Sequence, residues 1–315
     1  MKVSVHIITY NHEEYIAQAL DSVLMQKVDF DYEIVIGEDC STDNTRQIVV
    51  DYQQKYPDKI RALLHETNIG GTQNDIAVHN ACQGEYIAWL EGDDYWTSPH
   101  KLQKQVNYLD QHRECSMCFH STRHFHENGS RPDYNSKPPI AKEFFELEDL
   151  FYGSFMPTCS VMVRRVHIAK LPDWYEQTYA GDWGLQILIT KYGKIGYIDE
   201  VMGATRIHDR GVWNGLSKIQ QFKNMINDYK IMRENLAEMN TPEIANQISC
   251  FYHYWACKAA CEGNTRDARI SIIKSISESP FNPRISNVDR IKLFIKVYTP
   301  GLNTLINQLR TCLDA

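Results

Sequence analysis

The sequence predicts an α/β fold with a Rossmann-like, mostly parallel sheet flanked by helices, followed by an all-helical carboxy-terminal extension. Over the first part of the chain, short apolar runs alternate with helically spaced stretches, strand then helix three times and then strand again. This order is typical of parallel sheets, because each crossover between parallel strands needs a connecting helix. Past Gly215 the strand-like runs stop, and helical spacing continues to Ala315. We therefore expect two domains, 1–215 and 216–315.

The individual elements follow from the spacing of apolar residues. Apolar and β-branched runs predict strands at 3–8, 32–36, 60–64 and 86–90, and helical spacing predicts helices at 13–26, 45–52, 73–81 and 99–111. Further extended segments are expected at 116–125, 158–163 and 195–207, with a helix at 181–192. The segment 127–139 is rich in Asn, Ser, Pro and Gly, which predicts an exposed loop that could act as a lid or shape an acceptor site.

Bulk composition narrows the class of protein. The 315 residues are 43% hydrophobic and 23% charged, which is typical of a soluble globular protein. The net charge of −7 argues against general nucleic-acid binding, which relies on basic surface. No apolar run approaches the roughly 18 residues of a membrane-spanning helix, and the amino terminus predicts a strand rather than a signal peptide. Nine scattered cysteines fit reduced thiols, so we expect a cytoplasmic protein.

Three carboxylates follow the strand expected at 86–90: Glu91, Asp93 and Asp94. Ligands bind at the ends of strands in open α/β sheets, and crowded acids repel one another unless a cation or protons hold them together. Oxygen ligands of this kind suit Mg²⁺ or Mn²⁺. The alternative is a surface turn that caps the helix near Pro99. A solvated turn needs no apolar strand leading into it, so we favour a ligand site.

A second polar exit follows the strand at 32–36. If consecutive strands are neighbours, Glu38 and Asp39 lie beside the acids of the later strand. A carboxylate here could accept a hydrogen bond from a nucleotide base, and the ring of Tyr10 could cover a base face. The alternative for Asp39 is a turn residue that binds its own backbone. Taken together, the two exits predict one polar crevice.

Three segments, in order, resemble the successive signatures of family 2 glycosyltransferases. They are Val-Ser-Val-His-Ile-Ile-Thr-Tyr-Asn at 3–11, Glu-Asp-Cys-Ser-Thr-Asp-Asn-Thr at 38–45 and Leu-Glu-Gly-Asp-Asp-Tyr-Trp at 90–96. The resemblance covers residues 1–215. It implies the GT-A fold, which binds a nucleotide-sugar, and transfer of one sugar with inversion at its anomeric carbon.

The resemblance also implies roles for residues in the first loops and in the acid cluster. Thr9 and Tyr10 would line the nucleotide, and Asp39 would read its base. Asp93 would hold the metal, Mn²⁺ or Mg²⁺, on the diphosphate. The full nucleotide-binding set that we expect is Thr9, Tyr10, Asn11, Glu13, Asp39, Asn68 and Asp93, and the expected metal ligands are Asp93, Glu91, Asp94 and His208.

Asp182, in the triplet Gly-Asp-Trp, matches the position of the family's catalytic base. Its alternative role is a helix cap, since Asp is a preferred N-cap residue. Capping and catalysis are compatible. Trp183 could stack on a sugar and His120 could face the acceptor, although an aromatic side chain near a helix start more often belongs to the core.

The sequence departs from the family pattern at two positions. Glu38 and Glu91 stand where the family usually has Asp, and the longer side chain of Glu91 could act through water. The Gln-x-x-Arg-Trp motif of processive synthases is missing, as are their membrane helices. Transfer of a single sugar therefore fits better than polymerisation.

The expected donor is a UDP-sugar, with a dTDP-sugar as the alternative, and the expected acceptor is a glycan or a lipid-linked glycan. A basic amphipathic pattern runs from Asp289 onward and is continued by Leu302, Leu305, Ile306 and Leu309. Such a segment more commonly packs against the preceding helices or a partner subunit, as in a homodimer, and peripheral contact with the inner face of the cell membrane is the alternative. Two rival functions remain. A sugar nucleotidyltransferase would need a glycine-rich basic loop where Thr9 to Glu13 stand, and a catalytically silent glycan- or nucleotide-binding protein would release no UDP.

Overall fold

The computed structural model of the protein describes residues 1–179, 181–208, 211, 213 and 215–299. The chain divides into two compact units, residues 1–215 and 216–315. The first unit contains the sheet and the second contains only helices among its described residues. Both the predicted α/β class and the helical extension are confirmed.

The sheet of the first unit has ten strands among the described residues, and its main path runs β3-β2-β1-β4-β9-β6-β10-β5. Neighbours are parallel from β3 to β4 and between β6 and β10, whereas β9 and β5 run antiparallel to their neighbours. The strands are β1 (Val3–Thr9), β2 (Tyr32–Glu38), β3 (Ile60–Leu64), β4 (Tyr86–Glu91), β5 (Tyr95–Trp96), β6 (Cys115–His126), β7 (Tyr134–Asn135), β8 (Phe144–Phe145), β9 (Met162–Arg164) and β10 (Lys194–Ile207).

The three strands that end in polar signatures lie side by side. β1 pairs with β2 on one side and with β4 on the other, so that Thr9 stands opposite Glu38 and Ile8 opposite Glu91. These strands are apolar and almost fully buried along their length, as expected for parallel strands covered by helices on both faces. Their register brings the predicted polar crevice to one edge of the sheet.

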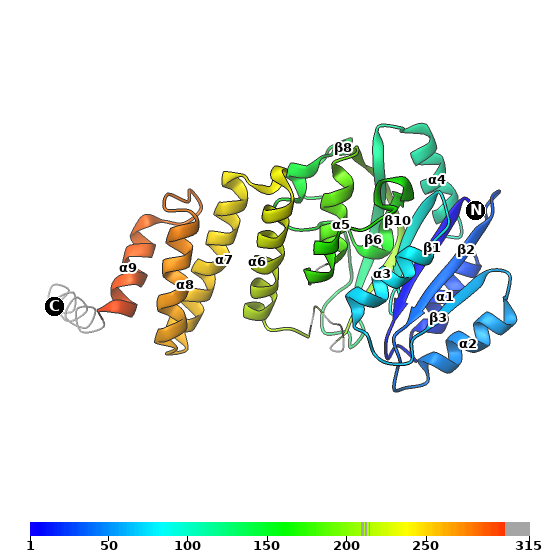
Figure 1. Cartoon of the computed structure of the whole chain (residues 1–315), viewed down its shortest axis with the longest axis horizontal. Helices are drawn as coiled ribbons and strands as arrows, with labels where there is room; N and C mark the ends of the chain where they lie inside the picture. The colour runs from blue at the N-terminus through cyan, green and yellow to red at the C-terminus, as the bar shows by residue number, and fades with distance from the viewer. Residues whose placement is uncertain (180, 209–210, 212, 214, 300–315) are drawn as a thin grey trace. The chain divides into compact units, whose positions relative to one another are not determined.

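The helices of the first unit pack against the sheet (Figure 1). In α1, for example, Ile16, Leu20 and Val23 are fully buried at helical spacing, which explains why this stretch folds as a helix against the sheet. The bounds are α1 (Ile16–Leu24), α2 (Thr45–Lys55), α3 (Gly71–Ala81), α4 (Lys101–Gln111) and α5 (Gly181–Thr190), with 3-10 turns η1 (Leu147–Leu150), η2 (Thr158–Ser160), η3 (Arg165–Ile168) and η4 (Asp173–Gln177).

One expected strand differs from the structure. The segment 158–163 begins as the 3-10 turn η2, and only Met162–Arg164 pairs as the strand β9. Its hydroxyl-bearing residues favour the turn, since Ser160 Oγ donates to the carbonyl of Pro157 at 2.6 Å and such local bonds compete with strand pairing. This turn contacts β4 and β10 and contributes to the site.

The second unit is a row of antiparallel helices in chain order (Figure 1). Buried small and aliphatic residues, including Ala256, Ala259 and Ile272, form its core. None of the described helices is both long and apolar enough to pass through a bilayer. The amphipathic pattern expected at Leu302 to Leu309 lies outside the described residues. The elements are α6 (Lys218–Asn235), η5 (Ala237–Met239), α7 (Pro242–Cys261), α8 (Thr265–Glu278) and α9 (Asn287–Tyr298).

Candidate active site

The acid cluster forms a tight turn between β4 and β5. The amide of Asp94 donates to the carbonyl of Glu91 at 3.1 Å, and the amide of Gly92 donates to the carbonyl of Ile8 at 3.0 Å. A side chain at Gly92 would not fit, because a Cβ there would lie 2.7 Å from Thr9 Oγ1 and 2.8 Å from His12 Nδ1. The glycine of the signature therefore lets the turn pack directly against the β1 loop.

Two histidines face the carboxylate of Asp93. His208 Nε2 lies 2.9 Å from Asp93 Oδ2, and His12 Nε2 lies 3.8 Å from the same oxygen. Burial by itself raises the pKa of Asp93, but the hydrogen bond with His208 and the charge of His12 lower it below its ordinary value. The same hydrogen bond raises the pKa of His208, whereas burial lowers the pKa of His12. Asp93 is thus the acid of the cluster that is held ionised.

The other two acids of the cluster are held toward the protonated form. Burial, followed by repulsion from Asp93, raises the pKa of Asp94 to about 8. Burial raises the pKa of Glu91 well above its ordinary value, and the charges of Asp94, Asp93 and Asp182 add to this effect. A proton or a cation placed between crowded buried carboxylates stabilises the protein, because it reduces their repulsion.

Asp182 lies in the first turn of α5 and joins this cluster through Thr158. Thr158 Oγ1 donates to Asp182 Oδ2 at 3.1 Å. The Thr158 hydroxyl also lowers the pKa of Glu91, so Thr158 is close to both acids. Burial raises the pKa of Asp182, which makes its carboxylate a stronger base. The helix amino terminus favours its negative charge.

Arg206, near the end of β10, was not singled out from the sequence. Its amide donates to Asp94 Oδ1 at 2.8 Å, and its Nε donates to the carbonyl of Asp93 at 3.1 Å. Its guanidinium lies 4.5 Å from the ring centroid of Tyr15 and also contacts Glu127 at 3.3 Å. Arg206 therefore fixes the backbone that presents both acids. The charged position two residues before His208 in an extended segment is the signal that could have revealed it.

The exit of β2 is stabilised by internal bonds. Asp39 accepts the amides of Ile69 at 2.7 Å and Gly70 at 3.0 Å, one on each carboxylate oxygen. Glu38 is fully buried, accepts the amide of Ser41 at 2.7 Å and pairs with Arg46. These contacts fix the loop in place, and base reading by Asp39 remains a prediction.

Most of the remaining nucleotide-binding candidates hold the loops together through hydrogen bonds, and one presents an exposed ring. Asn11 Oδ1 accepts the amide of Thr42 at 2.8 Å, Glu13 accepts that of Asn44 at 2.9 Å, and Asn68 Nδ2 donates to the carbonyl of Asp39 at 3.2 Å. Thr9 is buried, with its hydroxyl 3.2 Å from His12 Nδ1. Tyr10 is 41% exposed, so among these side chains it is the one with a free ring for a base.

The two residues expected at the acceptor are buried. His120 is fully enclosed, with Nδ1 at 2.8 Å from the carbonyl of Ser121, and burial lowers its pKa to about 3. Trp183 is also buried, and its Nε1 donates to the carbonyl of Leu150 at 3.1 Å. We therefore correct this expectation and place both rings in the interior, because both lie on core-facing positions of β6 and α5.

The chemistry of the cluster fits a divalent cation that is completed by a ligand. No three His, Cys, Asp or Glu side chains of the described chain form a ready metal cage. Mg²⁺ and Mn²⁺ are commonly bound by one or two carboxylates together with substrate phosphates, so a complete protein cage is not required. Ionised Asp93, with His208 beside it and Glu91 and Asp94 crowded behind, supplies the donor set for such a site.

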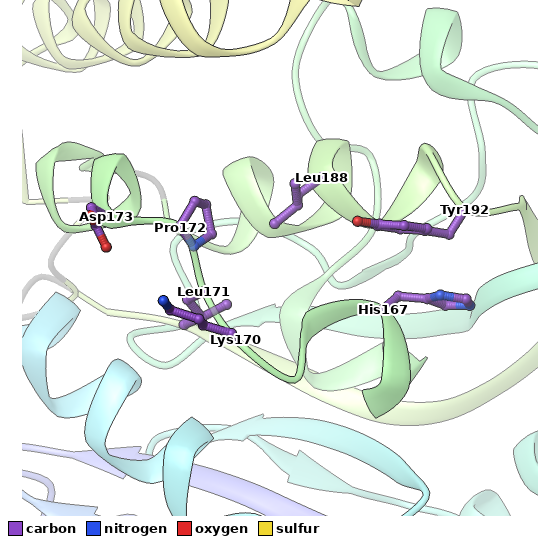
Figure 2. A pocket seen from close by; sticks show the side chains of 7 residues that line it. All are labelled: His167, Lys170, Leu171, Pro172, Asp173, Leu188 and Tyr192. Atoms are coloured by element: carbon purple, nitrogen blue, oxygen red, sulfur yellow. The ribbon is translucent and has the colours of Figure 1, made fainter.

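Two surface hollows lie in the first unit. One, of about 500 Å³, is lined by residues at the ends of β6 and β10 and in the loop beyond β6: His126, Arg131, Pro132, Asp133, Tyr134 and Ile207. The other, of about 380 Å³, is shown in Figure 2 and is lined by His167, Lys170, Leu171, Pro172, Asp173, Leu188 and Tyr192. The first lies close to the acid cluster, because Ile207 stands between Arg206 and His208, and both of these residues contact Asp93.

Comparison with known proteins identifies the family. The model of the family described as "Glycosyl transferase family 2" matches residues 4–171, which include β1, the exit of β2 and the acid cluster. The chain belongs to this family. This family 2 chain is 38% identical over 213 residues to the uncharacterised protein Rv1520 of Mycobacterium tuberculosis. The aligned residues cover 67% of this chain and 60% of that relative.

Solved structures share the fold of this family 2 chain. Residues 1–349 of Staphylococcus aureus TarS, in complex with UDP-GlcNAc, match with a TM-score of 0.69 and 19% identity, covering 96% of this chain and 92% of that chain. The mannosyltransferase PcManGT of Pyrobaculum calidifontis, in complex with GDP-Man and Mn²⁺, matches with a TM-score of 0.56 and 14% identity, covering 95% and 81%. At these identities the likeness establishes the fold alone.

Proposed function

We propose that this chain is an inverting glycosyltransferase that moves one sugar from a UDP-sugar to a hydroxyl of a glycan or lipid-linked glycan. One observation carries the proposal. The acid cluster at the end of β4 lies close to Asp182 at the start of α5, because Thr158, which donates to Asp182, also lowers the pKa of Glu91. An inverting transfer needs a donor-binding group and a base on opposite sides of one reacting carbon, and the acid cluster and Asp182 would fill these two roles.

The donor side consists of Asp93 and the groups around it. Asp93, with Glu91, Asp94 and His208 beside it, would hold Mn²⁺ or Mg²⁺, and such a cation neutralises negative charge on a departing diphosphate. His208 and His12 face the same carboxylate and can donate hydrogen bonds to phosphate oxygens. The exposed ring of Tyr10 and the fixed carboxylate of Asp39 would receive the base. The complexes named for TarS and PcManGT support a nucleotide-sugar donor and Mn²⁺.

The acceptor side is Asp182. Inversion requires a single in-line attack, so one base opposite the leaving group is sufficient. Asp182 would accept the proton of the attacking hydroxyl on a carboxylate oxygen as the new glycosidic bond forms. Its raised pKa makes it a better proton acceptor, and the hydrogen bond from Thr158 orients it.

Release of UDP tests this function. The full chain would be incubated with single UDP-sugars and Mn²⁺, with and without EDTA, and free UDP would be measured. We expect slow hydrolysis of one donor without acceptor, faster turnover with a glycan acceptor mixture, and loss of both with EDTA. Binding of UDP-sugar without any release under all conditions would favour the silent binding protein instead.

A further inference from the structure

The larger hollow lies beside the proposed reaction site, because Ile207, which lines it, stands between Arg206 and His208, and both of these residues contact Asp93. A row of polar side chains from η2, β10 and β6 also leads toward it. The row starts at Cys159, which directly follows Thr158, the donor to Asp182 Oδ2 (3.1 Å), and its contacts are Cys159 Sγ to Thr205 Oγ1 (3.5 Å), Thr205 Oγ1 to Thr122 Oγ1 (3.4 Å) and Thr122 Oγ1 to His124 Nε2 (3.1 Å). The row ends beside the hollow, because His124 stacks on Tyr134, which lines it.

Tyr134 offers a flat ring to this hollow. Its ring lies 4.8 Å from that of His124 with an interplanar angle of 9°, so one ring face is covered. The side chain is nevertheless 53% exposed, which leaves the other face open. A rigid, half-covered aromatic ring is a suitable platform for the C–H face of a sugar ring, since it gives contact area at little conformational cost.

The charges around the hollow favour an anion. Asp133 is paired with Arg123 at 3.4 Å, and Glu127 is paired with Arg206 at 3.3 Å. Each acid at the rim therefore already has a cationic partner. For Arg131, by contrast, no ion pair is found among the described residues, and its side chain lines the hollow. A guanidinium with free donors binds phosphate and carboxylate through paired hydrogen bonds.

We propose that this hollow is an acceptor subsite for an anionic sugar, with the sugar ring on Tyr134 and its phosphate or carboxylate on Arg131. The role of this hollow as an acceptor subsite rests on the proposed transferase function. The binding of an anionic sugar to the hollow does not, and it can be measured by itself. It places the specificity for the acceptor in the loop after β6, apart from the residues that hold the donor.

The second hollow provides a matched control. There Tyr192 stacks on His167 with the same geometry, 4.8 Å and 9°, and Tyr192 is 55% exposed, as Figure 2 shows for the two rings. This hollow lies near the other edge of the sheet, because Arg165, which begins the turn containing His167, donates its amide to the carbonyl of Glu85 just before β4 starts. Substitution of Tyr192 thus removes an equivalent ring near the start of β4, whereas the acids follow the end of β4.

The experiment measures binding of three probes to the full chain loaded with UDP and Mg²⁺: glucose, glucose 6-phosphate and glucuronate. Affinities would be determined by saturation-transfer NMR titration for the wild type and for Arg131→Gln, Tyr134→Ala, Tyr134→Phe and Tyr192→Ala, after thermal melting confirms that each variant folds. We expect at least one anionic probe to bind about tenfold more tightly than glucose. The preferred probe identifies the anion as phosphate or carboxylate.

The variants should separate the two contacts. Arg131→Gln should remove the preference for the anionic probe, Tyr134→Ala should weaken all three probes by roughly fivefold, and Tyr134→Phe and Tyr192→Ala should leave the affinities within about twofold of wild type. Equal binding of glucose and both anions, no binding of any probe, or an unchanged preference in Arg131→Gln would overturn the assignment. UDP release without anion binding would count against this subsite alone, and anion binding without UDP release would count against the transferase function alone.

Discussion

The ends of β2 and β4 lie on either side of β1 and both carry acids, yet these acids have different charged partners. After β2, Glu38 and Asp39 accept backbone amides, and Glu38 also pairs with Arg46. After β4, no Lys or Arg side chain of the described chain forms an ion pair with Glu91, Asp93 or Asp94; the only ion-pair partners there are histidines.

This difference suggests that the acids after β2 stabilise the fold and that the acids after β4 bind a ligand. Carboxylates that are satisfied by internal donors stabilise the fold and gain little from a ligand. Carboxylates that repel one another lower the stability of the free protein and gain from a bound cation. Substitutions at the two exits should therefore affect different properties, activity at β4 and stability at β2.

The largest effect is expected for Asp93→Ala. Loss of the ionised acid should reduce sugar transfer by about 10³-fold or more and should abolish the Mn²⁺-dependent part of UDP binding. Transfer would be followed by UDP release and nucleotide binding by calorimetry with and without Mn²⁺. Wild-type turnover in this variant would show that the β4 exit is framework like the β2 exit.

Asp182→Asn should come next. We expect a loss of about 10² to 10⁴-fold in transfer, because the amide cannot accept the acceptor proton, while the affinity for UDP and Mn²⁺ stays unchanged. Asn can still accept the hydrogen bond from Thr158, so the melting temperature of the protein should stay unchanged. Rates equal to wild type would reassign Asp182 as a helix-terminal residue without a role in catalysis.

A matched pair of neutral variants tests the comparison directly. Glu38→Gln should lower the free energy of unfolding by about 2 kcal/mol, since it weakens a buried carboxylate with two internal partners. Glu91→Gln, without metal, should leave this free energy within about 1 kcal/mol of wild type or raise it, because burial and the neighbouring acids already hold Glu91 toward its neutral form. Chemical denaturation in EDTA measures both. Equal losses in the two variants would remove the distinction between the exits.

The smallest effect is a dependence of stability on pH. The pKa of Asp94 is raised to about 8 in the folded protein, so the folded state holds a proton that the unfolded chain releases near its ordinary pKa of about 4. Stability from this group is therefore present at low pH and is lost as pH rises toward 8. In EDTA, Asp94→Asn should fall less in melting temperature between pH 6 and pH 8 than wild type, by a few degrees. An equal fall in the two proteins would contradict this role for Asp94.

The sequence predicted the elements whose signal is local. The apolar runs ending at Thr9, Glu38 and Glu91 were found because buried parallel strands are continuous apolar stretches, and their neighbouring exits followed from chain order. The fold class and the acid cluster depend on little more than this.

Features made by distant residues could not be predicted from local patterns. The grouping of Asp93 with His208, 115 positions away, was expected from the family resemblance alone. The ties of Arg206 to both acids require the pairing of β10 beside β6. The burial of His120 was missed because a polar residue on an alternating strand does not reveal which face is covered. The pairing of Glu38 with Arg46 reaches across the start of α2, and composition alone does not distinguish Glu38 from the acids after β4, which have no Lys or Arg ion-pair partner among the described residues.

The absence of space around Gly92 has a consequence for engineering. Any side chain at this position would collide with Thr9 and His12, and a shifted His12 would lose its approach to Asp93. Libraries that test the proposed acceptor subsite should therefore keep residue 92 constant and vary positions 131–134, whose side chains are exposed.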